Sequence, residues 1–143
     1  FNNNCANFVS QSYHAGGWDY HGGVNPKDMN NWSPNLTGLA RASYTWVGAK
    51  YLIRFAHNHA GLTYLGNIWF AYPGTALFVD WTKGSKTDGN IDHALLVTGL
   101  TKKHNPKISQ KSNNRHNIPL SKFIRIAKKQ GLKTIDWYGV QPG

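Results

Sequence analysis

A single cysteine, Cys5, lies near the start of the 143-residue chain and is the first residue to consider as a nucleophile. Asn4 before it is a good helix N-cap, and the apolar side chains after it recur with helical spacing, which predicts a helix from Asn4 to Gly16. At the first turn of a helix, the backbone N–H groups and the helix dipole favour a thiolate. A lone cysteine is otherwise most often a small buried apolar residue, so its position at the helix start is what favours catalysis.

His93 is the candidate general base for this thiol. It is followed by a wholly apolar run, Ala94 to Val97, which is typical of a strand in the core of a sheet. A histidine at the head of such a strand would extend from a rigid platform into a cleft. The alternative is a strand-end histidine that is only solvated, since a nucleophile and its base must meet in space. The other six histidines lie in expected loops or helix ends.

The remaining pattern predicts an α+β fold, with helices on one side of an antiparallel sheet. No internal repeat is present, so we expect one domain over residues 1–143, and the chain beginning at Phe1 indicates a piece of a longer secreted precursor. Irregular structure is expected over 18–39, helices over 43–57 and 120–130, and strands over 76–81, 92–100, 107–112 and 134–140.

The charge of the chain is strongly positive. Sixteen lysines and arginines oppose six acidic residues, all of them aspartate, which gives a net charge of +10. Without a glutamate, mechanisms that need this residue are excluded. From Thr101 onward, ten basic residues face the single Asp136, a bias that favours a polyanionic partner such as a cell-wall polymer, nucleic acid or acidic lipid. No apolar run approaches the roughly 18–20 residues of a transmembrane helix.

Several motifs resemble those of one family across nearly the whole chain. Asn4-Cys-Ala-Asn-Phe-Val-Ser-Gln11 is similar to the Asp-Cys-Thr/Ala-Asn-Phe-Val-Ser-Gln signature of the putative amidase domain family, which is related to the NlpC/P60 and CHAP cysteine hydrolases. Pro73-Gly74, Ile91-Asp-His-Ala-Leu-Leu-Val-Thr-Gly99 and Ser109-Gln-Lys-Ser-Asn-Asn-Arg115 follow in the family's order. The resemblance implies a papain-like fold, in which a helix bearing the cysteine packs against an antiparallel sheet bearing the histidine. Two departures are Asn4 in place of the usual aspartate, and Lys111 where the family often has histidine.

A third residue must hold the imidazole in the correct tautomer. We choose Asn113, after the third expected strand, because its amide oxygen can accept the ring N–H; Gln110 and Asn114 are rivals. The backbone N–H of Cys5 is the expected oxyanion donor, with the side chain of Asn4 as a second. For substrate contact we select four residues: Asn4, Gln110 and the two loop tryptophans, Trp18 and Trp32.

Two metal hypotheses are weaker than their structural alternatives. The pairs His57 and His59, and His104 and His116, suggest a nuclease-type metal centre, but residues two apart do not share a helix face, and neither cysteine nor glutamate joins them. A calcium site is suggested by oxygen-bearing side chains around a glycine-containing loop, yet the alternating spacing is missing and Asp-Gly first predicts a hairpin turn. The residues concerned, in and beside this loop, are Asp80, Asp88, Asn90 and Asp92. We therefore expect no metal and no cofactor.

The sequence thus predicts a secreted cysteine amidohydrolase or endopeptidase that cleaves amide bonds of peptidoglycan, through Cys5, His93 and Asn113. The expected partner is peptidoglycan or another anionic wall polymer, with an immunity or inhibitor protein in addition if the protein is a toxin. A non-catalytic basic wall-binding module is the first alternative, and it gives no reason for a cysteine at a helix start. A nucleic-acid-binding protein or nuclease is the second, and it predicts steep salt dependence.

Overall fold

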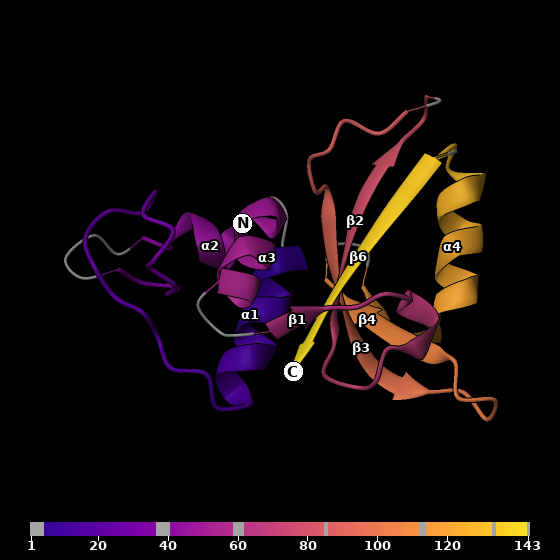
Figure 1. Ribbon diagram of the computed structural model, residues 1–143, viewed down its shortest axis with the longest axis horizontal. Coiled ribbons are helices and arrows are strands. Elements are labelled where there is room, and N and C mark those ends of the chain that lie inside the picture. The colour runs from indigo at the N-terminus through magenta and orange to yellow at the C-terminus, as the bar shows by residue number, and fades with distance from the viewer. Residues whose placement is uncertain are drawn as a thin grey trace.

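The computed structural model describes residues 5–36, 41–58, 62–84, 86–111, 114–132 and 134–142. It is an α+β fold built on one six-stranded antiparallel sheet with strand order β1-β6-β2-β3-β4-β5 (Figure 1). In chain order its elements are α1 (Cys5–Ala15), α2 (Tyr44–Val47), α3 (Ala49–Asn58), β1 (Leu62–Tyr64), the 3-10 helix η1 (Ile68–Phe70), β2 (Ala76–Thr82), β3 (His93–Leu100), β4 (Pro106–Gln110), β5 (Arg115–Pro119), α4 (Leu120–Lys129) and β6 (Thr134–Pro142).

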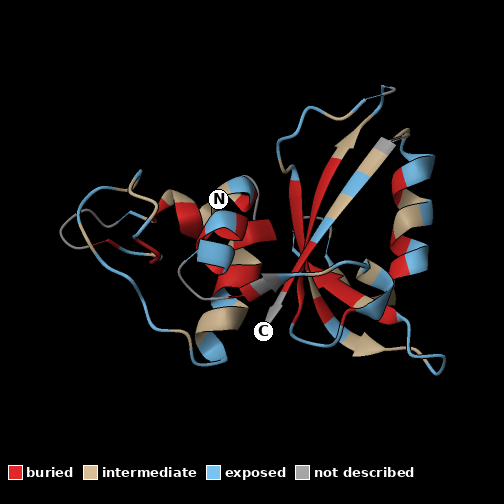
Figure 2. Ribbon diagram, in the orientation of Figure 1, coloured by how far each residue is buried: buried red, intermediate tan, exposed pale blue. Residues whose placement is uncertain are grey.

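Helices cover both faces of the sheet, which corrects the expectation that they lie on one side. α1 packs against β3 and β4, and α3 packs against β1 and β6, whereas α4 covers the opposite face over β4 and β5 (Figure 1). The buried residues accordingly form two clusters. The α1-side cluster includes Trp46, Phe55 and Phe78, and the α4-side cluster includes Leu95 and Phe123. Because both faces are covered, the central strands are buried on both sides, as their apolar runs predicted (Figure 2).

The second expected helix is divided in two at Gly48. This glycine adopts an extended backbone, with φ −106° and ψ 119°, and so ends α2 before α3 begins. A Cβ at this position would lie 2.6 Å from Cδ2 of Tyr51, so only glycine fits without displacing that ring. The apolar side chains of the two helices still face the core, and Trp46, Ala49, Ile53 and Ala56 are all buried.

The aromatic loop after α1 folds back onto the helices. Backbone groups of His21 and Trp32 pair with each other, and the Trp32 indole is fully buried, with its centroid 5.5 Å from that of Phe55. Trp32 Nε1 donates to Ser10 Oγ at 3.1 Å, and Ser10 Oγ donates to the carbonyl oxygen of Trp46 at 2.9 Å. Ser10 therefore joins α1 to the loop and to α2.

Substitution of Ser10 by alanine is expected to destabilise the fold by about 1–3 kcal/mol, because it leaves the Trp32 N–H and the Trp46 carbonyl buried without this partner. Ser12→Ala is the matched control on the same helix, since Ser12 Oγ donates only to the carbonyl of Phe8, one turn earlier. Urea denaturation of the two variants measures the difference. Equal unfolding midpoints would show that the Ser10 hydrogen bonds do not stabilise the packing of α1.

Candidate functional site

His93 is held at the first position of β3 by a hydrogen bond to the neighbouring strand. Its Nε2 lies 2.6 Å from Oε1 of Gln110, the last residue of β4, and both side chains are buried. In the register of β3 and β4, Leu96 lies opposite Ser109 and Val97 opposite Ile108, which puts Gln110 diagonal to His93 on the same face of the sheet. With the amide oxygen toward the ring, Nε2 donates the hydrogen bond and Nδ1 is the unprotonated nitrogen.

Two aromatic side chains enclose the imidazole. The ring stacks against Trp81 with 5.3 Å between centroids, and against Phe123 of α4 with 6.3 Å. Burial lowers the pKa of His93, because the charged ring loses water, and the hydrogen bond from the ring to Gln110 partly offsets this by raising it. His93 is therefore neutral at neutral pH and can accept a proton, which is the state a general base requires.

Cys5 begins α1, as the sequence predicts, and is buried with 1% of its surface exposed. It belongs to the α1-side cluster, together with Ala6, Val9 and Ala94. α1 packs on β3, the strand that His93 begins. The helix therefore brings the sulfur close to the sheet that carries the imidazole, in an apolar setting that keeps water from the thiol.

Phe8, Gln110 and their neighbours surround a cavity of about 250 Å³ at this end of the sheet. Phe8 belongs to α1, Gln110 ends β4 and Arg115 begins β5, so the cavity lies where these three elements meet. Its lining residues include three basic or potentially basic side chains, Lys111, Arg115 and His116.

The side chains of Cys5 and His93 lie in different clusters. Side chains alternate along β3, so Ala94 joins the α1-side cluster with Cys5, whereas His93 stacks on Phe123 of the α4-side cluster. The contacts of the imidazole are with Gln110, Trp81 and Phe123. The structure thus brings together a histidine and the amide of Gln110, and the pairing of that histidine with Cys5 stays a prediction.

The other residues selected from the sequence have different outcomes. Asn4 and Asn113 lie outside the described residues, so the choice of Asn113 as the orienting group stays a prediction, while its rival Gln110 is the residue in contact with His93. Trp32 is a fully buried core residue, which corrects its assignment to a substrate groove. Trp18 is half-buried and lines a cavity of about 180 Å³ with Asp19, His21 and Phe55.

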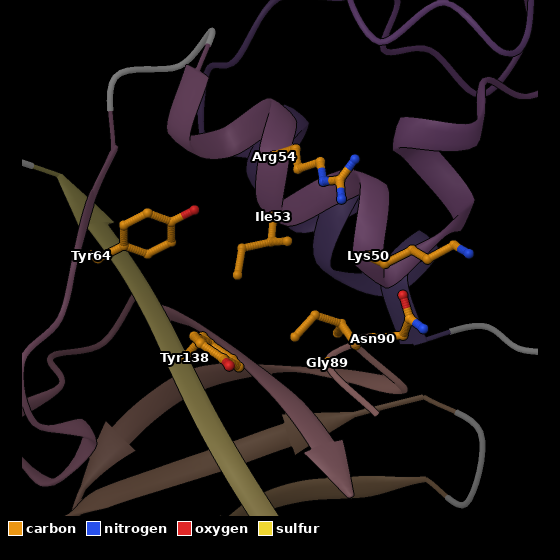
Figure 3. A pocket seen from close by; sticks show the side chains of 8 residues that line it. Lys50, Ile53, Arg54, Tyr64, Gly89, Asn90 and Tyr138 are labelled. Atoms are coloured by element: carbon orange, nitrogen blue, oxygen red, sulfur yellow. The ribbon is translucent and has the colours of Figure 1, made fainter. Parts of the chain in front are cut away.

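A larger cavity of about 370 Å³ lies between α3 and the edge of the sheet (Figure 3). Lys50, Ile53 and Arg54 approach it from α3, and the half-exposed rings of Tyr64 and Tyr138 approach from β1 and β6. The loop before β3 closes the remaining side through Gly89, Asn90 and Ile91. The cavity combines two cations with apolar and aromatic surface, a combination that suits an anionic ligand with a bulky apolar part.

Sequence reasoning missed the aromatic contacts of His93. Trp81 is the last residue of the expected strand 76–81, and Phe123 falls within the expected helix 120–130, but neither was connected with His93. Trp81 follows Val79 by two residues, so the two side chains share a face of the sheet. Because Val79 lies directly opposite His93, this spacing is the signal that could have placed Trp81 beside His93. No comparable signal exists for Phe123, whose contact depends on how α4 crosses the sheet.

Comparison with known proteins supplies one match. The model of the putative amidase domain family matches residues 1–135, which include Cys5, His93 and Gln110. No curated protein and no solved structure matches the chain. Within the described ranges, moreover, no helix combines the length and apolar character needed to cross a bilayer.

Proposed function

The chain belongs to the putative amidase domain family, and from this premise we propose that it is a secreted cysteine amidohydrolase that cleaves amide bonds of bacterial peptidoglycan. Membership of this family supports hydrolysis of an amide bond. The observation that carries the proposal for the mechanism is the 2.6 Å hydrogen bond between His93 and Gln110 at the end of the sheet where α1 begins. A buried neutral imidazole held by an amide oxygen is the base and orienting group of a papain-type site.

In the proposed reaction, Cys5 Sγ attacks the carbonyl carbon of the substrate amide, and its proton passes to Nδ1 of His93. The backbone N–H of Cys5, at the start of α1, stabilises the oxyanion together with Asn4. His93 then protonates the leaving amine as the C–N bond breaks. Water, deprotonated by His93, hydrolyses the resulting thioester and restores the thiol. The mechanism requires Sγ and Nδ1 to come within hydrogen-bond reach, about 3–3.5 Å, when substrate is bound.

Charge supports a cell-wall substrate. The chain carries a net charge of +10, and basic residues line both the cavity beside Gln110 and the cavity under α3. Peptide stems of peptidoglycan present carboxylates, and other wall polymers present phosphates, so both would be attracted to this surface. Four exposed basic side chains on α4 add to the attraction: Lys122, Arg125, Lys128 and Lys129. If the protein is a toxin, an immunity protein that covers the site would be a further partner.

Digestion of purified peptidoglycan sacculi tests the proposed substrate and bond. We expect the protein to release peptides or to create new amino groups, which mass analysis of the soluble fragments identifies. We also expect the initial rate of release, over the first minutes, to be the same with and without a chelator. Adsorption to sacculi without any release would instead favour a basic wall-binding module. Release of glycan fragments alone would contradict hydrolysis of an amide.

Replacement of Gln110 by alanine is expected to lower kcat for amide hydrolysis by about 10- to 100-fold with little change in KM, because the imidazole loses the acceptor that holds its tautomer. Gln130→Ala is the matched control, since Gln130 is exposed at the end of α4. Gln110→Asn should recover part of the loss only if an amide oxygen still reaches the ring. Steady-state kinetics of the three variants measure this. An unchanged kcat in Gln110→Ala would assign the orienting role to another residue.

A further inference from the structure

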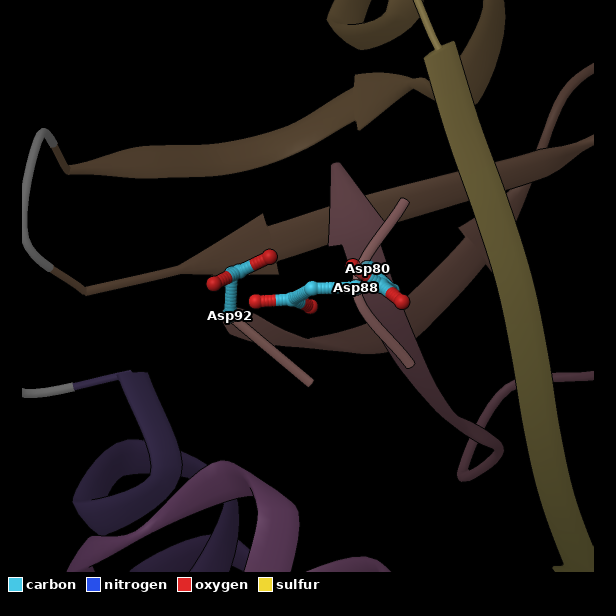
Figure 4. Close-up of side chains that lie close together, drawn as sticks. All are labelled: Asp80, Asp88 and Asp92. Atoms are coloured by element: carbon cyan, nitrogen blue, oxygen red, sulfur yellow. The ribbon is translucent and has the colours of Figure 1, made fainter. Parts of the chain in front are cut away.

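Three of the six acidic residues of this basic chain converge on one point. Asp80 lies near the end of β2, Asp88 lies in the loop that follows, and Asp92 immediately precedes β3. One carboxylate oxygen from each residue lies within 4.8 Å of those from the other two (Figure 4). In a protein with a net charge of +10, three carboxylates this close require a specific reason, because like charges at such distances repel.

Asp80 is the buried member of the group. Only 1% of its surface is exposed, and its Oδ2 accepts a hydrogen bond from the backbone N–H of Gly89 at 2.7 Å. Its Oδ1 is buried and has no hydrogen-bond partner within the part of the chain that the structure describes. Burial raises the pKa of Asp80, the hydrogen bond from the Gly89 N–H partly offsets this by lowering it, and the proximity of Asp88 and Asp92 raises it further. A buried carboxylate oxygen without a partner is costly, and a bound cation would compensate it.

The other two carboxylates are held in place by backbone N–H groups of the loop and of β2. Asp88 Oδ1 accepts from the N–H of Asn90 at 2.9 Å, and Asp92 Oδ2 accepts from the N–H of Trp81 at 3.1 Å. Gly89 turns the chain between them with a φ of 83°, which an L side chain rarely adopts. Both aspartates are exposed to solvent, so a hydrated cation can reach the buried oxygen of Asp80 from this side.

We propose that Asp80, Asp88 and Asp92 form a binding site for Ca²⁺. The sequence favoured a simple hairpin turn here because it shows no alternating ligand spacing within the loop. In the structure the buried ligand, Asp80, comes from β2, the strand before the loop. The three carboxylates therefore converge without an alternating spacing inside the loop. The site lies beside His93 in the sequence, but its binding of calcium does not depend on the proposed amidase reaction.

The chemistry of the ligands selects calcium among the common cations. All three offer hard carboxylate oxygens, with neither nitrogen nor sulfur, which suits calcium or magnesium rather than zinc. Magnesium demands ligands at about 2.0–2.1 Å and commonly takes only one or two carboxylates, whereas calcium accepts several at about 2.3–2.6 Å. Carboxylate oxygens that all lie within 4.8 Å of one another are close enough to share one ion of this kind.

Calorimetric titration of CaCl₂ into the chelator-treated full chain tests this site, with MgCl₂ as the comparison. We expect one calcium per chain, weaker binding of magnesium, and a Tm raised by about 5–10 °C at calcium concentrations 100-fold above Kd. Sensitised Tb³⁺ luminescence gives a second readout, because Trp81 adjoins Asp80 in the chain and can transfer excitation energy to a bound ion. None of these measurements requires activity.

Two variants and one matched control make the result specific. Asp88→Asn and Asp80→Asn should each weaken calcium binding by about tenfold or more, because each removes a charged ligand. Asp80→Asn should also melt, without calcium, at or above the temperature of the wild type, because it removes the uncompensated buried charge. Asp19→Asn changes an exposed aspartate far from the group in sequence and should bind like the wild type. Absence of calcium binding to the wild type, or equal binding by all variants, would overturn the proposal.

Discussion

Replacement of Cys5 by alanine is expected to reduce amide hydrolysis by about 10³-fold or more, because no covalent intermediate can then form. The change removes one sulfur atom from a buried position at the start of α1, so the helix should persist. Cys5→Ser keeps the shape more closely and should be almost as inactive, since a serine hydroxyl without a matched base is a poor nucleophile. Hydrolysis of a peptidoglycan-derived peptide, followed by appearance of the new amine, measures both variants.

Thermal melting is the necessary control for the Cys5 variants, because the residue belongs to the α1-side cluster. A Tm close to that of the wild type, combined with the loss of hydrolysis, assigns the effect to chemistry. Removal of a nucleophile typically lowers the rate by about 10³-fold. If either variant keeps more than about a tenth of the wild-type rate, the reaction does not use the thiol.

Replacement of His93 by asparagine is expected to lower the rate by about 10²- to 10⁴-fold, because the reaction then lacks the group that takes and returns the proton. Asparagine is smaller and polar, so it fits this position but loses the contact that Nε2 of His93 makes with Oε1 of Gln110. His104→Asn is the matched control: His104 is exposed and has a φ of 65°, a conformation that asparagine tolerates well. Initial rates at saturating substrate measure both variants.

The two histidine variants separate catalysis from folding. Comparable melting temperatures with a large difference in rate would support His93 as the base. Equal rates for His93→Asn and the wild type would remove His93 from the reaction and leave it as a core residue packed beside Trp81 and Phe123.

Elements with a clear apolar period could be predicted from the sequence. α1, β2, β3 and α4 lie within a few residues of their expected bounds, because their repeating apolar residues mark which side is buried. β5 was missed because its residues, Arg115 to Pro119, are largely polar, and Asn117 has a left-handed φ of 54°. β1 was missed because a three-residue edge strand carries too short a pattern.

The sequence could not show on which face of the sheet a helix lies. In α4 the spacing of Phe123 and Ala127 marks the apolar side of the helix, yet periodicity shows only that this side is buried, not against which face of the sheet. The same limit applies to His93. Its position at the head of an apolar strand was predicted, but the face of the sheet on which its side chain lies follows from its pairing with Val79. Its contacts with Trp81 and Phe123 follow from that face.

The partner of His93 depends on strand register, which composition does not determine. The pairing of β3 with β4 shifts between Val97 and Gly99, and that of β4 with β5 shifts between Ile108 and Gln110. One residue of shift moves a side chain to the other face, so the sequence alone leaves the choice among Gln110, Asn113 and Asn114 open. Trp32 shows a related limit, because a loop tryptophan is exposed or buried according to how the loop folds back.

The central claim is that Cys5 reacts as a nucleophile with the help of His93. Alkylation of the native protein by iodoacetamide at neutral pH tests it most directly, because Cys5 is the only cysteine and one adduct identifies it by mass. The account predicts a single adduct under native conditions, formed at least about tenfold faster in the wild type than in His93→Asn, because the thiolate is the reactive form. A sulfur that reacts only after denaturation, or at equal rates in the two proteins, would contradict it.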